Sequence, residues 1–214
     1  MGDSDIPTQN DHTDQSVSEP PLQFENRKKD HIRLALSSST QAEGMSGLSQ
    51  VRLLHEALPE LDFQDINLGC DFFGERSASP LFISSMTAGH TGSLDLNLIL
   101  ARVAERRGWC LGVGSQRREL FDSTAHQEWI RIRKACPDVL LMGNIGLSQI
   151  IRTKPSEIQR LVEAMQAVAI FVHTNPLQEW LQPEGTPLFK GGYEALEALV
   201  KCLGVPVVLK ETGC

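Results

Sequence analysis

Short apolar runs alternate four times with segments of helical periodicity, and this alternation limits the possible folds more than any other feature of the chain. Each run has the length of a buried strand, and each helical segment has apolar residues three or four positions apart. The strand-like runs are PLFISS (80–85), CLGVG (110–114), VLLMGNIG (139–146), AVAIFV (167–172) and VPVVLKETG (205–213). The segments expected to be helical are 94–108, 126–135, 156–167 and 193–204. Successive βα units predict an α/β fold with a parallel sheet.

Local signals mark the ends of some helices. Gly108 and Gly204 stand where the periodic pattern stops, as glycine does after many helices. Ser156 and Gln159 have the spacing of a capping box, which predicts a helix start at Ser156.

Polar residues gather after the strands rather than before them. The segments concerned are SSMTAGH, GSQRRE, NIG, HTNPLQE and KETG. A (β/α)8 barrel and a doubly wound open sheet both bind ligands at the carboxyl ends of their strands, so this placement does not choose between them. Neither a G-x-G-x-x-G nor a Walker A pattern is present, so the sequence has no nucleotide-binding fingerprint.

The stretch HTNPLQEWLQPEG (173–185) is the densest of these polar segments and directly follows the most apolar run. It places an imidazole, several amides and two carboxylates within 13 residues of a strand end. Surface loops are polar, but such a concentration of hydrogen-bonding and proton-transferring groups favours a functional site.

Composition narrows the class of protein. The chain has 214 residues and a formal charge of −7, which argues against a duplex nucleic-acid partner. Five scattered cysteines without a C-x-x-C pair suggest neither a zinc site nor a disulfide framework. The sequence has no leader-like segment and no apolar run of membrane-spanning length, so we expect a cytoplasmic protein without a membrane partner. Residues 1–26 are acidic and poor in apolar residues, which predicts a disordered tail; residues 27–214 form the folded part.

Six short motifs, in order and mostly at strand ends, resemble type II isopentenyl diphosphate isomerase, a flavin-dependent barrel enzyme. They are RKKDHI, SSMTAG, GVGSQR, NIG, HTNPLQEWLQPEG and VVLKETG. Ala88 and His90 depart from the usual M-T-G-G of the family, and Thr174 replaces a commonly apolar residue. The resemblance implies a (β/α)8 barrel, which typically takes about 250 residues. Only about the first five βα units are recognisable, so we expect a C-terminally truncated barrel.

The resemblance implies interconversion of isopentenyl diphosphate and dimethylallyl diphosphate. In this family reduced FMN is expected to serve as acid and base, Mg²⁺ binds with the diphosphate, and NADPH keeps the flavin reduced. A full-length relative of this kind is expected to be a homo-oligomer.

Residues at positions that match the family's motifs are expected to have the roles that the family gives them. Gln178 and His173 are the expected catalytic residues, and Glu179 is the expected Mg²⁺ ligand, because hard cations prefer carboxylate oxygens. The expected substrate-binding residues are Arg27, Lys28, His31, Ser115, Gln116, Arg117, Asn175 and Gln178. The expected flavin-binding residues are Ser85, Met86, Thr87, Ser115, Asn144 and Lys210.

Two alternatives stay open. Another FMN-dependent barrel oxidoreductase, such as a hydroxy-acid oxidase, would share the fold but would need a catalytic His and Arg pair beyond the recognisable units. A truncated fragment without catalytic activity, binding a partner or nothing, is the other. The HTNPLQE motif argues against the first alternative. The reading frame beyond Cys214 would test the second alternative, because a further half-barrel there would make this chain a piece of an enzyme.

Overall fold

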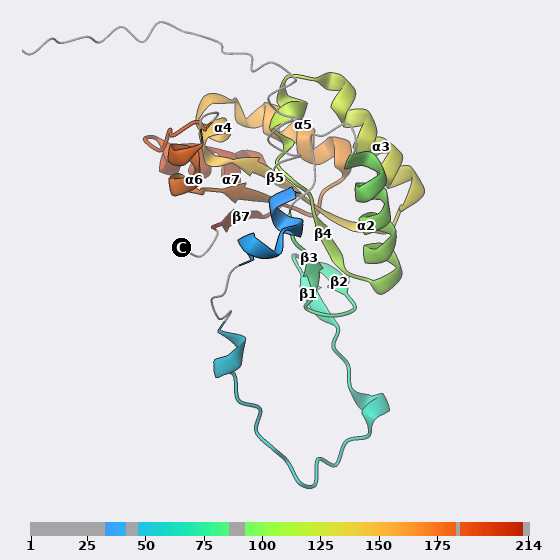
Figure 1. The fold of residues 1–214 in the computed structure, drawn as a ribbon. Coiled ribbons are helices and arrows are strands. Elements are labelled where there is room, and N and C mark those ends of the chain that lie inside the picture. Colours follow the sequence, from blue (N-terminus) through green and yellow to red (C-terminus); the bar gives the residue numbers. More distant parts are fainter. Residues whose placement is uncertain (1–32, 42–46, 86–92, 183–184, 212–214) are drawn as a thin grey trace, which may run out of the picture.

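A parallel five-stranded sheet forms the centre of the computed structural model, which describes residues 33–41, 47–85, 93–182 and 185–211 (Figure 1). The strands lie in the order β3-β4-β5-β6-β7, which is also their order in the chain. Their bounds are Phe82–Ile83, Cys110–Gly112, Leu140–Gly146, Ala169–His173 and Val207–Lys210. All five fall inside the runs predicted from the sequence, apart from His173, which extends β6 by one residue. The α/β class and the parallel sheet are therefore confirmed.

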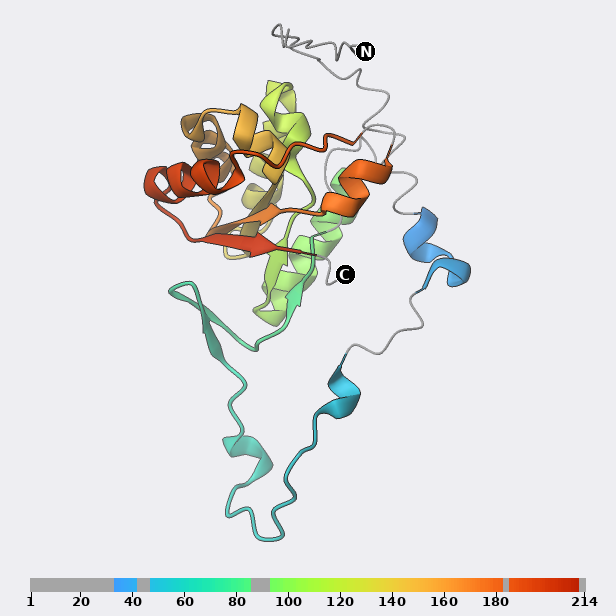
Figure 2. The same cartoon turned by 90° about the vertical axis from the view of Figure 1, so that its left-hand side faces the viewer.

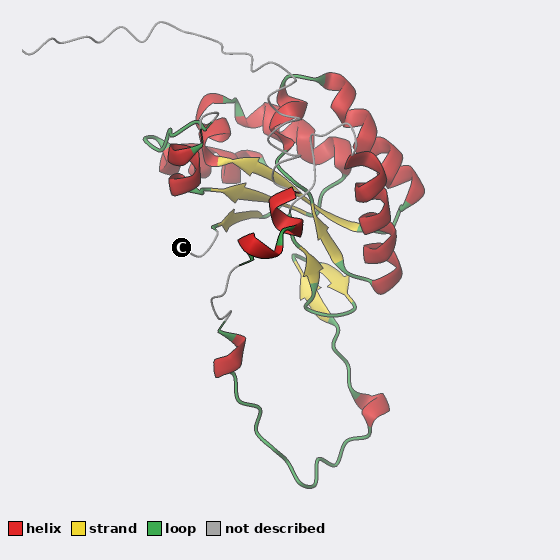
Figure 3. Cartoon of the chain, viewed as in Figure 1, coloured by secondary structure: helices red, strands yellow, loops and turns green. Residues whose placement is uncertain are grey.

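The connecting helices form a layer against the sheet (Figure 3). Their bounds are Ser93–Arg107 for α2, His126–Ala135 for α3, Pro155–Met165 for α5 and Gly192–Cys202 for α7. Helices that follow each other around the sheet also touch each other: α2 contacts α3, α3 contacts α5, and α5 contacts α7. A doubly wound sheet reverses its strand order at a switch point, whereas this sheet does not within the described strands. The unreversed order is that of a partial (β/α) barrel.

The main core lies between the sheet and these helices. Leu111, Leu141, Ile145 and Val172 contribute from the strands, and they pack against helix residues such as Ile132 and Ile158. A smaller cluster of Cys110, Met142, Ala169 and Phe171 lies apart from it. Both β5 and β6 are buried almost throughout, as strands covered on two faces are.

Several elements of the structure were not expected from the sequence. Strands β1 (Cys70–Phe72) and β2 (Glu75–Ser77) form an antiparallel hairpin before the sheet. Two short helices, α4 (Leu147–Arg152) and α6 (Pro176–Leu181), follow β5 and β6 directly. Residues 33–36 are helical, and residues 47–68 run as an exposed excursion away from the sheet (Figure 2). Short 3-10 helices complete the described elements: η1 (Ser38–Thr40), η2 (Leu48–Gln50), η3 (Phe63–Asp65), η4 (Gln116–Leu120) and η5 (Ser123–Ala125).

The predicted capping box of α5 is wrong. The helix begins at Pro155, and its N-cap is Lys154, which makes no side-chain cap. Proline suits the first turn of a helix because it has no N–H to satisfy and its φ is already helical. Ser156 therefore lies inside the first turn, and Gln159 donates instead to Glu163.

Candidate functional site

A buried hydrogen-bonded pair joins the carboxyl ends of β5 and β6. The Asn144 Oδ1 atom lies 2.9 Å from His173 Nδ1, and the Asn144 amide Nδ2 donates to the Val113 carbonyl at 3.1 Å. In the sheet register Gly146 is opposite His173, and His173 is opposite Lys210. Three expected site residues thus lie near the carboxyl end of the sheet: Asn144 and Lys210 for the flavin, and His173 for catalysis.

Gln116 ties this pair to the loop after β4. Its side chain is 1% exposed, and its Oε1 accepts a hydrogen bond from the Asn144 backbone N–H at 3.2 Å. A Cβ atom at Gly143 would lie 2.9 Å from the same oxygen. Glycine at 143 therefore lets the Gln116 amide approach the strand backbone. Gln116 is positioned by the scaffold, and its expected contact with substrate stays a prediction.

Gly146 is a second position in β5 where side chains lie close to the strand backbone. A Cβ there would collide with Gln149 Oε1 and would lie 3.1 Å from His173 Nε2. The Gln149 side chain is buried beside this point, on the first turn of α4. Sequence reasoning missed Gln149, because its position in the site depends on the turn from β5 directly into α4.

Residues 176–181 of the polar segment after β6 fold as helix α6. Asn175 precedes it in the left-handed conformation, with φ of 38°, and its Nδ2 donates to Gln178 Oε1 at 3.1 Å. The Asn175 Oδ1 atom is buried and has no hydrogen-bond partner. An unpaired buried oxygen costs free energy, so a ligand donor at this position would stabilise it.

Glu179 is buried on α6, with 6% of its surface exposed. Its Oε2 accepts a hydrogen bond from the Thr186 N–H at 2.7 Å, and the Thr186 hydroxyl lies 3.2 Å from Arg117 Nη2. The expected metal ligand and the expected diphosphate-binding arginine are thus joined through one residue. Gly185 permits this turn, because a Cβ there would collide with the Glu179 carbonyl.

Ser85 lies just after β3, and its buried hydroxyl has no hydrogen-bond partner. A Cβ at Gly112 would lie 2.6 Å from that hydroxyl, so the ends of β3 and β4 approach closely there. A flavin ring carries carbonyl and N–H groups at its edge, and orphaned polar atoms beside close-packed glycines fit such a group. Of the expected flavin residues, Ser85 has such an unpaired atom, whereas both polar atoms of the Asn144 side chain are hydrogen-bonded within the protein. Ser115 is half-buried and directly precedes η4.

Several expected residues are not placed by the structure. Arg27, Lys28, His31, Met86 and Thr87 lie outside the described residues. Within the described ranges, no group of three or more His, Cys, Asp or Glu side chains is arranged to hold a metal ion. Across the same ranges, no helix is long and apolar enough to cross a membrane.

Glu119 is a second residue that sequence reasoning missed. It lies on η4 with 5% of its surface exposed, and its Oε1 accepts a hydrogen bond from Trp129 Nε1 at 2.9 Å. Burial raises the pKa of this carboxyl to about 7, against the opposing effect of the Trp129 hydrogen bond. GSQRREL contains no pattern that distinguishes this buried carboxylate from a solvated one.

Comparisons with known proteins agree with the motifs. A curated isopentenyl-diphosphate delta-isomerase of Bdellovibrio bacteriovorus is 53% identical over 202 residues, which cover 92% of this chain and 58% of the relative. Relatives of the same name from Legionella pneumophila and Archaeoglobus fulgidus are 49% and 38% identical, and cover 90% and 87% of this chain and 56% and 54% of their own lengths. No protein-family model matches the sequence.

Among solved structures, a mandelate oxidase variant with (S)-mandelic acid aligns with a TM-score of 0.52 at 18% identity, covering 88% of this chain and 60% of that one. At this identity the likeness concerns the fold alone. The sequence relatives confirm the resemblance drawn from the motifs: over about nine-tenths of its length the chain is homologous to isopentenyl-diphosphate delta-isomerases, and it spans about half the length of the curated relatives it matches.

Proposed function

We propose that this chain supplies part of the active site of a flavin-dependent isomerase that interconverts isopentenyl diphosphate and dimethylallyl diphosphate. The observation that carries the proposal is the Asn144–His173 pair, buried at the sheet edge where the unpaired oxygens of Ser85 and Asn175 also lie at strand ends. The names of the curated relatives support the same reaction.

In this proposal FMN would bind at the carboxyl ends of β3 to β7. Ser85, Asn144 and Lys210 would bind the ring, together with Ser115 and the expected contacts from Met86 and Thr87. A lysine at the end of β7 suits negative charge on a reduced ring. When bound and reduced by NADPH, FMN would supply the acid and base that move the double bond.

The chain's own residues bind and orient the diphosphate substrate. Arg117 presents a planar fork of N–H donors that matches phosphate oxygens, and Arg27, Lys28 and His31 are expected to complete the clamp. Glu179 would be the protein's carboxylate ligand to Mg²⁺, with diphosphate oxygens and water as the others. Magnesium in proteins is commonly held in this way, through one or two carboxylates and substrate phosphates.

His173 and Gln178 would face the alkene end of the substrate. Asn144 holds one ring nitrogen of His173, and this contact restricts the ring orientation. Asn175 donates to the Gln178 carbonyl oxygen and so orients the Gln178 amide. We propose that these two side chains position the reacting carbons.

A chimera tests this proposal. Residues 1–214 replace the matched part of the Bdellovibrio relative, and FMN binding and isomerisation are measured with and without Gln178→Ala. The substitution should lower kcat at least tenfold and leave the FMN dissociation constant within about twofold, because the amide would orient substrate but would not hold cofactor. Unchanged turnover would remove Gln178 from the site.

A further inference from the structure

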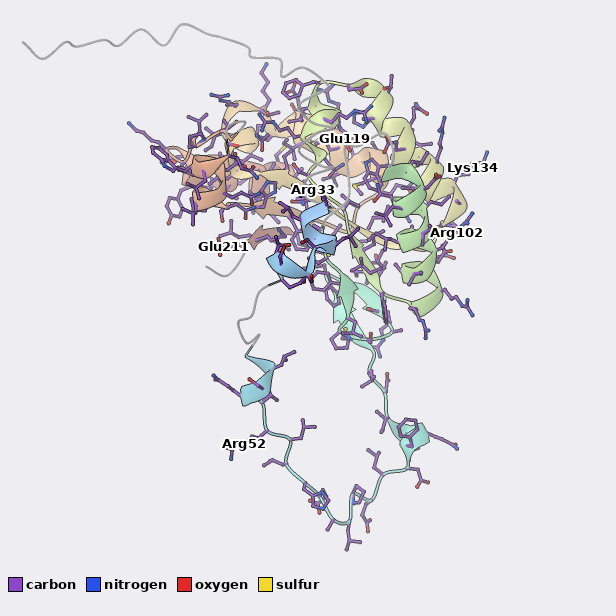
Figure 4. The ribbon with its side chains drawn as sticks, viewed as in Figure 1. Arg33, Arg52, Arg102, Glu119, Lys134 and Glu211 are labelled. Carbon is purple, nitrogen blue, oxygen red and sulfur yellow. The ribbon has the colours of Figure 1, made fainter. Side chains whose placement is uncertain are left out.

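Glu119 and Trp129 form a buried polar contact that joins η4 to α3. The Trp129 side chain is 1% exposed, and its indole N–H donates to Glu119 Oε1 at 2.9 Å. The second carboxyl oxygen, Oε2, is also buried and has no hydrogen-bond partner. Figure 4 labels Glu119 within the body of the protein, whereas Arg102 and Lys134 extend from the outer helices.

The Glu119 carboxyl accepts from an indole N–H, whereas the neighbouring carboxylates of Asp122 and Glu128 pair with a guanidinium. Arg118 pairs with Asp122 at 2.8 Å and with Glu128 at 3.5 Å, so the nearest guanidinium contacts other carboxylates. Burial also raises the pKa of Glu119, which favours a neutral carboxyl that accepts from an indole and bears its own proton. A buried acid of this kind is costly to maintain, so a packing role alone would be better filled by an apolar side chain.

The helix η4 connects this contact to the site. Glu119 and Gln116 lie three positions apart on the same short helix, and η4 packs against β5 and α5. Gln116 then accepts from the Asn144 backbone N–H at 3.2 Å, and Asn144 holds His173 at 2.9 Å. A shift of η4 would therefore move Gln116 away from the strand that carries Asn144.

We infer that Glu119 is a positioning residue, whose hydrogen bond to Trp129 fixes η4 on α3 so that Gln116 holds the Asn144–His173 pair in place. Its importance for the reaction rests on the proposed function, but the positional effect on His173 does not. Within the described part of the chain the Glu119 side chain bonds to Trp129, so its effect on the site passes through η4.

The test uses the chain of residues 1–214 with ¹⁵N-labelled histidine, without flavin or substrate. The ring nitrogen shifts of His173 are compared in Glu119→Gln, Glu119→Leu and Trp129→Phe. Glu119→Gln keeps an oxygen for the indole and should leave these shifts unchanged. Glu119→Leu and Trp129→Phe should move both ring nitrogens toward the averaged values of a freely tautomerising histidine. Glu194→Gln is the matched control, because this exposed carboxylate lies on α7 and is not part of the junction between η4 and α3.

A merely structural role for Glu119 would lower the melting temperature and leave the His173 shifts of the folded protein unchanged, and this result would overturn the inference. Trp129→Phe keeps an aromatic ring in the core, so it tests the hydrogen bond even where Glu119→Leu fails to fold. Because the readout needs neither FMN nor substrate, altered His173 shifts support the inference even if the chimera proves inactive; inactivity would count against the proposed function alone.

Discussion

Among single residues, side chains near the carboxyl ends of strands were predictable and those fixed by turns were not. Asn144 and His173 lie near the carboxyl ends of apolar runs in the sequence, and the structure joins them by a hydrogen bond. Gln149 and Glu119 lie on short helices whose direction depends on contacts distant in sequence. Their burial follows from tertiary packing, which no local pattern of residue types specifies.

The buried Glu119 carboxyl predicts a dependence of stability on pH. Burial raises its pKa in the folded protein to about 7 from the ordinary 4.5, so its stabilising contribution is complete below pH 4.5 and is lost as pH rises through 7. The loss is on the order of 3 kcal/mol, from about 1.4 kcal/mol per pKa unit.

Urea unfolding at pH 5 and pH 8 measures this effect. Glu119→Gln should remove most of the decrease in unfolding free energy between the two pH values. Glu194→Gln, at an exposed position of α7, should leave it unchanged. An equal decrease in the parent and in Glu119→Gln would show that the Glu119 carboxyl ionises normally.

Glu179 predicts a metal dependence. In the chimera, Glu179→Gln should raise the Mg²⁺ concentration for half-maximal activity roughly tenfold or more, because an amide oxygen is a poorer partner for a hard cation than a carboxylate. A Mg²⁺ titration of initial rates measures this. Titrations that superimpose for parent and variant would exclude Glu179 as a metal ligand.

Gly146 predicts a steric limit beside His173. In Gly146→Ala the added methyl group would collide with Gln149 Oε1 and crowd His173 Nε2, so the unfolding free energy should fall by about 1–3 kcal/mol. Gly204→Ala is the control, because no atom lies within 4 Å of a Cβ there. Thermal melting compares the two, and equal stability of the two variants would mean that Gln149 moves aside at little cost.

At the element scale, periodicity predicted the long helices and the strands, but it did not predict α6. The helix Pro176–Leu181 is too short for an amphipathic repeat, and its start depends on Asn175 adopting a left-handed conformation. Proline at the first helical position was a signal that could have revealed it. Asparagine before that proline also tolerates a left-handed backbone better than most residues do. The hairpin of β1 and β2 was missed because each strand has three residues.

Arg133 links neighbouring βα units through hydrogen bonds to backbone carbonyls. Its Nη1 donates to the carbonyls of Pro137 and Val139, and its Nη2 donates to those of Met165 and Gln166. It thus joins the end of α3 to the start of β5 and the end of α5. A lysine cannot reach four oxygens with this geometry.

Arg133→Lys should therefore lower the unfolding free energy by about 2 kcal/mol, since the carbonyls of the buried residues Val139 and Met165 lose donors. Arg131→Lys, at an exposed position on the same helix, should change it by less than about 0.5 kcal/mol. Chemical denaturation of both variants measures the difference. Comparable small effects would mean that water replaces the guanidinium at these carbonyls.

At the scale of the whole molecule, strand order distinguishes the fold. Alternating strands and helices left both a barrel and a doubly wound sheet open, and the unreversed order of β3 to β7 favours the barrel. The order was not predictable from the residues alone, because the apolar strand patterns are similar in both folds. The curated relatives are nearly twice as long as the part they share with this chain.

We propose that the polar groups at the ends of β3 to β7 form part of an isomerase site. The most direct measurement is the conversion of isopentenyl diphosphate by the chimera with reduced FMN and Mg²⁺, followed by NMR. We predict dimethylallyl diphosphate at a rate within about tenfold of the Bdellovibrio parent, and a rate at least a hundredfold lower in the double variant His173→Ala, Gln178→Ala. A folded chimera that binds FMN but forms no dimethylallyl diphosphate would contradict the claim.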